Sequence, residues 1–67
     1  MIKVLKLKAK IIEKGYTIDS ISKEIGIDKS TFHRKMQKDS FLVKEVALLK
    51  KILCLSKDEA DDIFFGN

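Results

Sequence analysis

The stretch YTIDSISKEIGIDKSTFHRKM, from Tyr16 to Met36, decides the fold that we expect for this chain. Thr17 is a residue type that caps the free amides at the start of a helix, and the apolar residues after it fall at helical spacing. Gly26 stands where that helix would need a left-handed residue to end. Asp28 can cap a second helix almost at once. Two short helices joined so tightly must cross steeply, which is the geometry of a helix-turn-helix.

The apolar residues of this stretch give each predicted helix one buried side. The first helix is expected over residues 18–25 and the second over about residues 29–37. Phe32 and Met36 lie one turn apart and form the buried stripe of the second helix. The buried side of the first helix and the turn consists of Ile18, Ile21, Ser22, Ile25 and Ile27.

The opposite side of the second predicted helix carries only polar and basic side chains. They are Ser30, His33, Arg34 and Gln37, with Thr31 and Lys38 at the flanks. This side has no carboxylate and no large apolar group, and it offers the donors, acceptors and positive charge that base edges and phosphates require. Arg34 is the strongest candidate, because arginine binds guanine bidentately and also contacts phosphate. We therefore expect this side to contact double-stranded DNA.

Three further segments are expected to be helical. In residues 3–14, apolar residues alternate with lysines at a strand-like period of two, but the pattern also fits a helix that ends at Gly15. We favour the helix, whose buried face would carry Ile2, Leu5, Ala9 and Ile12. The segment over residues 43–53 would bury Val46, Leu49 and Leu53, with Val43 and Ile52 beside them. The last segment starts at Ser56, forms a capping box with Glu59, and would bury Ala60, Ile63 and Phe64.

The length and composition favour one small helical domain. The 67 residues include no proline, three glycines and one cysteine, so neither a disulfide nor a metal site is expected to hold the fold, and no cofactor is predicted. We predict an all-α, compact bundle of about five short helices that forms a single domain over residues 1–67. We find no membrane span and no signal-peptide core, and a lone thiol fits a reducing compartment, so a cytoplasmic location is expected.

The charge is distributed unevenly along the chain. Residues 1–55 hold thirteen Lys and Arg against six Asp and Glu, a net +7, whereas residues 56–67 hold one lysine against four carboxylates, a net −3. A basic body can attract DNA, but an ordinary solvated surface explains the same pattern equally well. For the series Lys3, Lys6, Lys8 and Lys10, a solvated face is favoured over a binding stripe.

The stretch from Tyr16 to Met36 resembles the helix-turn-helix of the Cro and phage-repressor family. The resemblance rests on the capping threonine, the small residue Ser22, the turn glycine with an aliphatic residue after it, and the polar cap with its Lys-Ser-Thr opening. The segments around Phe41-Leu-Val-Lys-Glu-Val and Leu55-Ser-Lys-Asp-Glu-Ala also look like the fourth and fifth helices of this family. The chain is most similar to short regulators of phages and prophages of Gram-positive bacteria.

That resemblance implies a lambda-repressor-like DNA-binding domain with its third helix in the major groove of the DNA. The base-contacting positions of the family fall on Lys29, Ser30, Thr31, His33 and Arg34, and its phosphate contacts fall on Thr17 and near Lys38 and Ser40. Three residues depart from the family pattern. Ile18 stands where many members have a glutamine that contacts the backbone, Leu42 where the fourth helix often has a threonine cap, and Cys54 where glycine or asparagine is common.

Two functions remain open, together with one candidate dimer contact. The first is a sequence-specific repressor that occludes a promoter, and the second is a phage modulator or antirepressor that binds another repressor protein. An enzyme is not expected, because one histidine, one cysteine and scattered carboxylates form no catalytic set. Phe65 lies off the buried stripe and is a candidate homodimer contact, which would match a palindromic operator. Cys54 is expected to be a small packed hydrophobe.

Overall fold

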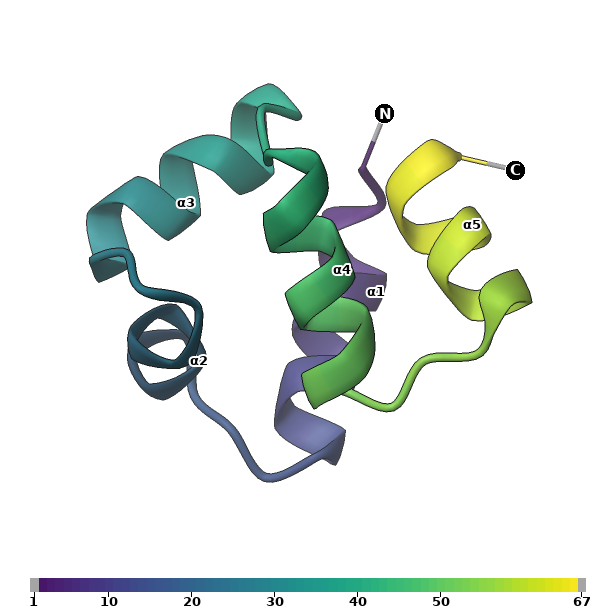
Figure 1. Cartoon of the computed structure of the whole chain (residues 1–67), viewed down its shortest axis with the longest axis horizontal. Helices are drawn as coiled ribbons and strands as arrows, with labels where there is room; N and C mark the ends of the chain where they lie inside the picture. Colours follow the sequence, from purple (N-terminus) through teal and green to yellow (C-terminus); the bar gives the residue numbers. More distant parts are fainter. Residues whose placement is uncertain (1, 67) are drawn as a thin grey trace.

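The computed structural model of this chain describes residues 2–66 and consists of five helices (Figure 1). They are α1 (Val4–Glu13), α2 (Ile18–Ile25), α3 (Lys29–Lys38), α4 (Val43–Ile52) and α5 (Lys57–Phe65). The described residues contain no strand. The prediction of an all-α bundle of about five short helices is confirmed, and the ambiguous residues 3–14 form a helix.

The predicted caps at the starts of α2 and α3 are both present. Thr17 Oγ1 accepts a hydrogen bond from the Ser20 N–H at 3.0 Å, and Ser20 Oγ accepts one from the Thr17 N–H at 2.9 Å. Asp28 Oδ1 accepts the Thr31 N–H at 2.7 Å. Each cap satisfies amides that have no partner within the helix, so the sequence fixes where both helices begin.

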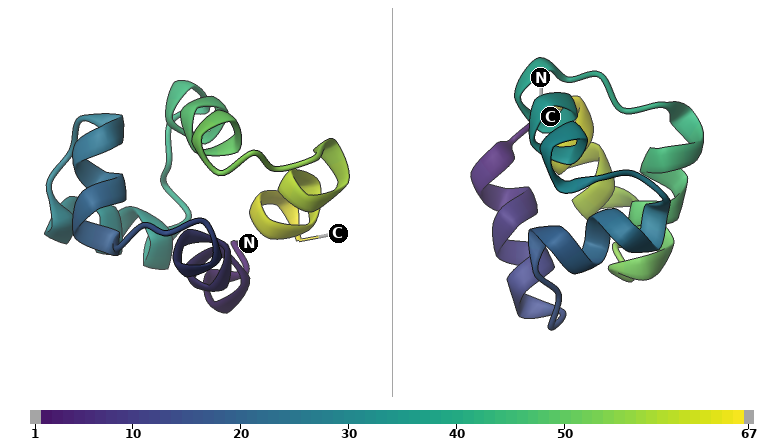
Figure 2. Two further views of the ribbon diagram at one scale, coloured as in Figure 1. Left: turned by 90° about the horizontal axis from the view of Figure 1, so that it is seen from below. Right: turned by 90° about the vertical axis from the view of Figure 1, so that its left-hand side faces the viewer.

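The helices surround one cluster of buried apolar side chains. In Figure 1, α4 lies in front of α1, with α5 on one side and α2 and α3 on the other, and Figure 2 shows the same arrangement from two further directions. The ring centroids of Phe32 and Phe41 lie 5.2 Å apart and those of Phe41 and Phe64 6.4 Å apart, both edge-to-face. Phe41, in the loop after α3, therefore links α3 to α5 through the core.

The buried face of α1 differs from the predicted one. Leu7 and Ile11 are fully buried, whereas Leu5 is 82% exposed, Ile12 is 73% exposed, and Ala9 between them is also exposed. Of the predicted face, only Ile2 is buried. The alternating pattern gives this helix two apolar sides, and only one of them can pack against α2 and α5.

Two other predictions of burial are wrong. Val43 is 88% exposed because Glu45, Leu49 and Leu53 define the inward side of α4, and Val43 lies about a third of a turn from it. Cys54 is exposed because it lies between two buried leucines and has a left-handed backbone, with φ = 51°. That conformation is costly for a residue with a Cβ atom, so Cys54 introduces backbone strain at this corner.

Candidate nucleic-acid interface

The connection between α2 and α3 holds the two helices in a steep crossing. Gly26 ends α2 in the left-handed conformation, with φ = 83°, and the Ile27 N–H donates to the Ser22 carbonyl at 3.0 Å. Ile27 then packs against the core, and Asp28 starts α3. In Figure 1, α2 is seen nearly end-on while α3 lies across the view. The left-handed Gly26 and the Asp28 cap predicted from the sequence are present, and Thr17 and Ile18 at the start of α2 line one hollow together with His33 of α3.

One side of α3 packs into the core and the other faces solvent. Phe32 and Met36 are buried, as predicted. The exposed residues of the helix are Lys29, Ser30, Arg34, Gln37 and Lys38, and Thr31 is half-buried beside them. Arg34, Lys29 and Lys38 make no ion pair within residues 2–66. The outer side of α3 therefore presents several polar groups and three cations. None of these cations pairs with a carboxylate within the described part of the chain.

Lys35 is the exception among the cations of α3, and the sequence reasoning did not single it out. Its Nζ lies 2.7 and 2.8 Å from the two carboxylate oxygens of Glu45 on α4, and the side chains are only 15% and 5% exposed. Glu45 Oε1 also accepts the Leu42 N–H at 2.8 Å. Burial alone would raise the pKa of Glu45, but these hydrogen bonds and the lysine charge lower it. The sequence did contain a signal for this role of Glu45. It is the third residue of α4, and it follows Leu42, whose side chain cannot cap the helix, so its carboxylate can bond back to the free amide at the helix start.

The start of α3 brings a carboxylate close to the predicted base-contacting residues. Asp28 accepts hydrogen bonds from Thr31, and Ser30 Oγ donates to it at 3.4 Å. These bonds lower the pKa of Asp28, to which the Arg34 charge also contributes. The Ser30 hydroxyl and the Thr31 N–H thus take part in the cap, whereas the other predicted base-contacting residues, Lys29, His33 and Arg34, do not.

Thr17 and His33 lie apart from the outer side of α3. Both line a hollow of about 420 Å³ between α1, the start of α2 and the middle of α3, together with Lys8, Ile11, Ile12, Tyr16 and Ile18. His33 is half-buried, and Thr17 is exposed. The structure therefore divides the predicted DNA contacts into a central group around Arg34 and an edge group next to α1.

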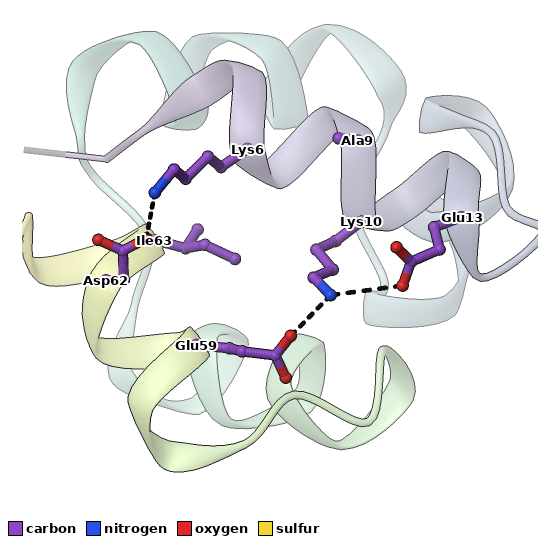
Figure 3. A pocket seen from close by; sticks show the side chains of 7 residues that line it. All are labelled: Lys6, Ala9, Lys10, Glu13, Glu59, Asp62 and Ile63. Atoms are coloured by element: carbon purple, nitrogen blue, oxygen red, sulfur yellow. Dashed lines mark hydrogen bonds and ion pairs between the residues drawn. The ribbon is translucent and has the colours of Figure 1, made fainter.

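The basic residues of α1 are directed largely toward α5. Lys6 Nζ lies 2.6 Å from Asp62, and Lys10 Nζ lies 2.6 Å from Glu59 and 3.3 Å from Glu13 (Figure 3). Lys3 pairs with Asp62 as well. These three lysine side chains remain partly exposed to solvent, as predicted, but they also pair with acidic residues of α5, which the sequence reasoning did not foresee. These lysines are neutralised within the chain and do not extend the basic surface of α3.

Comparisons with protein-family models, curated proteins and solved structures find no match to the chain. Within residues 2–66, no group of three or more His, Cys, Asp or Glu side chains is arranged to hold a metal ion. In the same part of the chain, no helix combines the length and the apolar character needed to cross a membrane.

Proposed function

We propose that this chain is a sequence-specific DNA-binding regulator of transcription that inserts α3 into the major groove. It would act as a Cro-like repressor, as the resemblance to phage and prophage regulators implies, by binding an operator that overlaps a promoter. The observation that supports this most directly is the outer side of α3. Arg34, Gln37 and Lys38 are exposed there, whereas the remaining cation of the second half of the helix, Lys35, is held by Glu45.

The residues of this surface would have different roles. Arg34 lies at the middle of the exposed side, where it can reach a guanine edge, and Gln37 is one turn away. Lys29 and Lys38, at the two ends of α3, would neutralise phosphates on either side of the groove and give a salt-dependent affinity. Thr17, at the edge, would contact the phosphate backbone. The fold itself holds α3 rigidly through Phe32, Met36 and the Lys35–Glu45 pair.

The substitution Arg34→Ala tests the assignment of a base contact. An operator is first identified by selection of bound sequences from a random duplex library, which also shows whether the site is palindromic. Arg34→Ala should then weaken binding to that operator by about 1–3 kcal/mol and leave binding to random duplex much less affected. Lys51→Ala, which removes an exposed cation of α4 away from the other surfaces discussed, is the matched control and should change neither binding to the operator nor binding to random duplex. If the selection enriches no sequence above background, the proposal is contradicted.

A homodimer would give the protein a two-fold axis that matches a palindromic operator. Phe65 is 62% exposed and lies at a hollow of about 300 Å³ between α4 and α5, whose apolar lining includes Phe41, Val43 and Ala47. Two copies could exchange their phenylalanines into these hollows. Phe65→Ser should shift the sedimentation coefficient toward that of a monomer. A wild-type chain that is monomeric well above the concentration needed to bind DNA would rule the dimer out.

A further inference from the structure

The exposed side of α1 carries an apolar stripe that the fold does not use. Leu5 and Ile12 are 82% and 73% exposed, and the exposed Ala9 lies between them. The spacing of four and three residues places all three on one side of the helix, opposite the buried Leu7 and Ile11. Two large aliphatic side chains with a small residue between them form the pattern of a helix-packing seam, in which a partner side chain fits over the small residue.

The stripe continues into the hollow beside the start of α2. Ile12 lines both, and Tyr16 and Ile18 extend the apolar lining toward α3. The hollow ends at Thr17 and His33, the edge group of the proposed DNA-binding surface. The apolar surface therefore runs from the first turn of α1, through Ile12, to the rim of the proposed DNA-binding face.

The two borders of the stripe differ in charge. Toward α5, Ala9 lines a pocket with lysines and carboxylates that pair with one another: Lys6 with Asp62, and Lys10 with Glu13 and Glu59. The other border carries an unpaired cation. Lys8 is one turn from Ile12, lines the same hollow, and makes no ion pair within residues 2–66. A partner that covers the stripe therefore gains most if it brings a carboxylate to Lys8.

We propose that the stripe formed by Leu5, Ala9 and Ile12, with the adjoining hollow, binds an amphipathic helix of another protein that carries acidic residues beside its apolar face. Phosphates gain nothing from aliphatic side chains, so DNA does not explain the stripe. An antiparallel pair of two copies through this stripe would set one Lys8 against the other, which disfavours a second copy of the chain.

Occupation of this surface would antagonise DNA binding. A helix that fills the hollow covers Thr17 and His33, and its carboxylates would lie next to the phosphates that α2 approaches. This consequence rests on the proposed function, whereas the docking itself does not. The partner and the operator would then compete for the protein, which would relieve repression.

The docking is tested with labelled helical peptides and fluorescence anisotropy, in the absence of DNA. The probe is a peptide with leucines at three- and four-residue spacing and glutamates beside them, and the comparison is the same peptide with lysines in place of the glutamates. We expect the acidic peptide to bind at least about tenfold more tightly, with an affinity that falls as salt rises. Equal affinities for the two peptides, or no binding of the acidic one, would overturn the proposal.

Matched substitutions localise the binding site. The double variant Leu5→Gln/Ile12→Gln should weaken the acidic peptide about tenfold or more, and Lys8→Gln should reduce the preference for the acidic peptide. Leu48→Gln, at an exposed aliphatic residue on α4 that lines none of these hollows, is the control and should leave binding unchanged. These side chains lie at the surface, so circular dichroism should show unaltered folding. If Leu48→Gln weakens the peptide as much as the double variant does, the assignment to α1 is wrong.

Two further measurements separate this proposal from its alternatives. Addition of operator duplex should displace the acidic peptide, and simultaneous binding of both would refute the competition but not the docking. Failure of the protein to bind any DNA at low salt would refute the proposed function while peptide binding persists. Conversely, loss of self-association or of binding to anionic lipid vesicles in the Leu5→Gln/Ile12→Gln variant would assign the stripe to a second copy or to a membrane and overturn the proposal.

Discussion

Replacement of Glu45 by glutamine tests how firmly the fold holds α3 in place. The carboxylate accepts two hydrogen bonds from Lys35 Nζ at 2.7 and 2.8 Å and one from the Leu42 N–H at 2.8 Å. Glutamine has nearly the same shape and can still accept the Leu42 N–H, but it removes the negative charge. The Lys35 ammonium, whose side chain is only 15% exposed, then loses its counter-ion.

The magnitude of the loss follows from the burial of the pair. Removal of one partner of a fully buried ion pair costs about 3–5 kcal/mol, because the other charge is left without compensation. Lys35 is partly exposed and can swing its ammonium toward water, so we expect a loss of about 2–3 kcal/mol for Glu45→Gln. A chain of this length has a free energy of unfolding of about 3–10 kcal/mol, so the variant should lie near the limit of folding. The corresponding decrease in Tm is about 10–20 °C.

Urea and thermal unfolding, followed by circular dichroism at neutral pH, measure this loss. The exposed pair of Lys23 and Asp19 on α2, at 3.5 Å with side chains 76% and 56% exposed, provides a matched control. Asp19→Asn should change the stability by no more than about 0.5 kcal/mol. The double variant Lys35→Met/Glu45→Gln should be more stable than Glu45→Gln alone, because it leaves no unpaired charge.

A small effect would refute this reasoning. If Glu45→Gln costs no more than Asp19→Asn, the Lys35–Glu45 pair behaves as a surface pair and does not position α3. If the double variant is no more stable than Glu45→Gln alone, the loss does not come from a stranded lysine charge.

Three further substitutions test other parts of the fold. Cys54→Gly should raise the free energy of unfolding by up to about 1 kcal/mol in urea unfolding, because it relieves the left-handed backbone at φ = 51°, and a decrease would show that this corner is unstrained. Gly26→Ala should lower the free energy of unfolding by about 1–2 kcal/mol in the same assay, because a φ of 83° is strained for a residue with a Cβ atom even though the space around Gly26 is open. Lys10 and the Ser56 N–H lower the pKa of Glu59 to about 2, below its unfolded value, so this stabilisation is present above about pH 5 and is lost as the pH falls toward 2. Glu59→Gln should therefore flatten the decrease in Tm over that pH range, and an unchanged pH profile would contradict the role of Glu59.

The sequence alone determined the parts of the fold that depend on neighbouring residues. Thr17, Asp28 and Ser56 cap helices through amides only three residues away, and Gly26 ends α2 through its own backbone freedom. Phe32 and Met36 mark the buried side of α3, since the opposite side of that helix is entirely polar. In each case the neighbouring residues favour only one local conformation or one buried side, so the sequence pattern is unambiguous.

Only the tertiary structure decided which of two equally apolar sides of α1 is buried. Leu5 and Ile12 are as apolar as Leu7 and Ile11, and only packing against α2 and α5 separates the two pairs. The same holds for the charged contacts. Lys35 of α3 reaches Glu45 of α4, and Lys6 of α1 reaches Asp62 of α5, which is 56 residues away along the chain. Such contacts depend on how helices are placed in space, and periodicity along the chain carries no information about that placement.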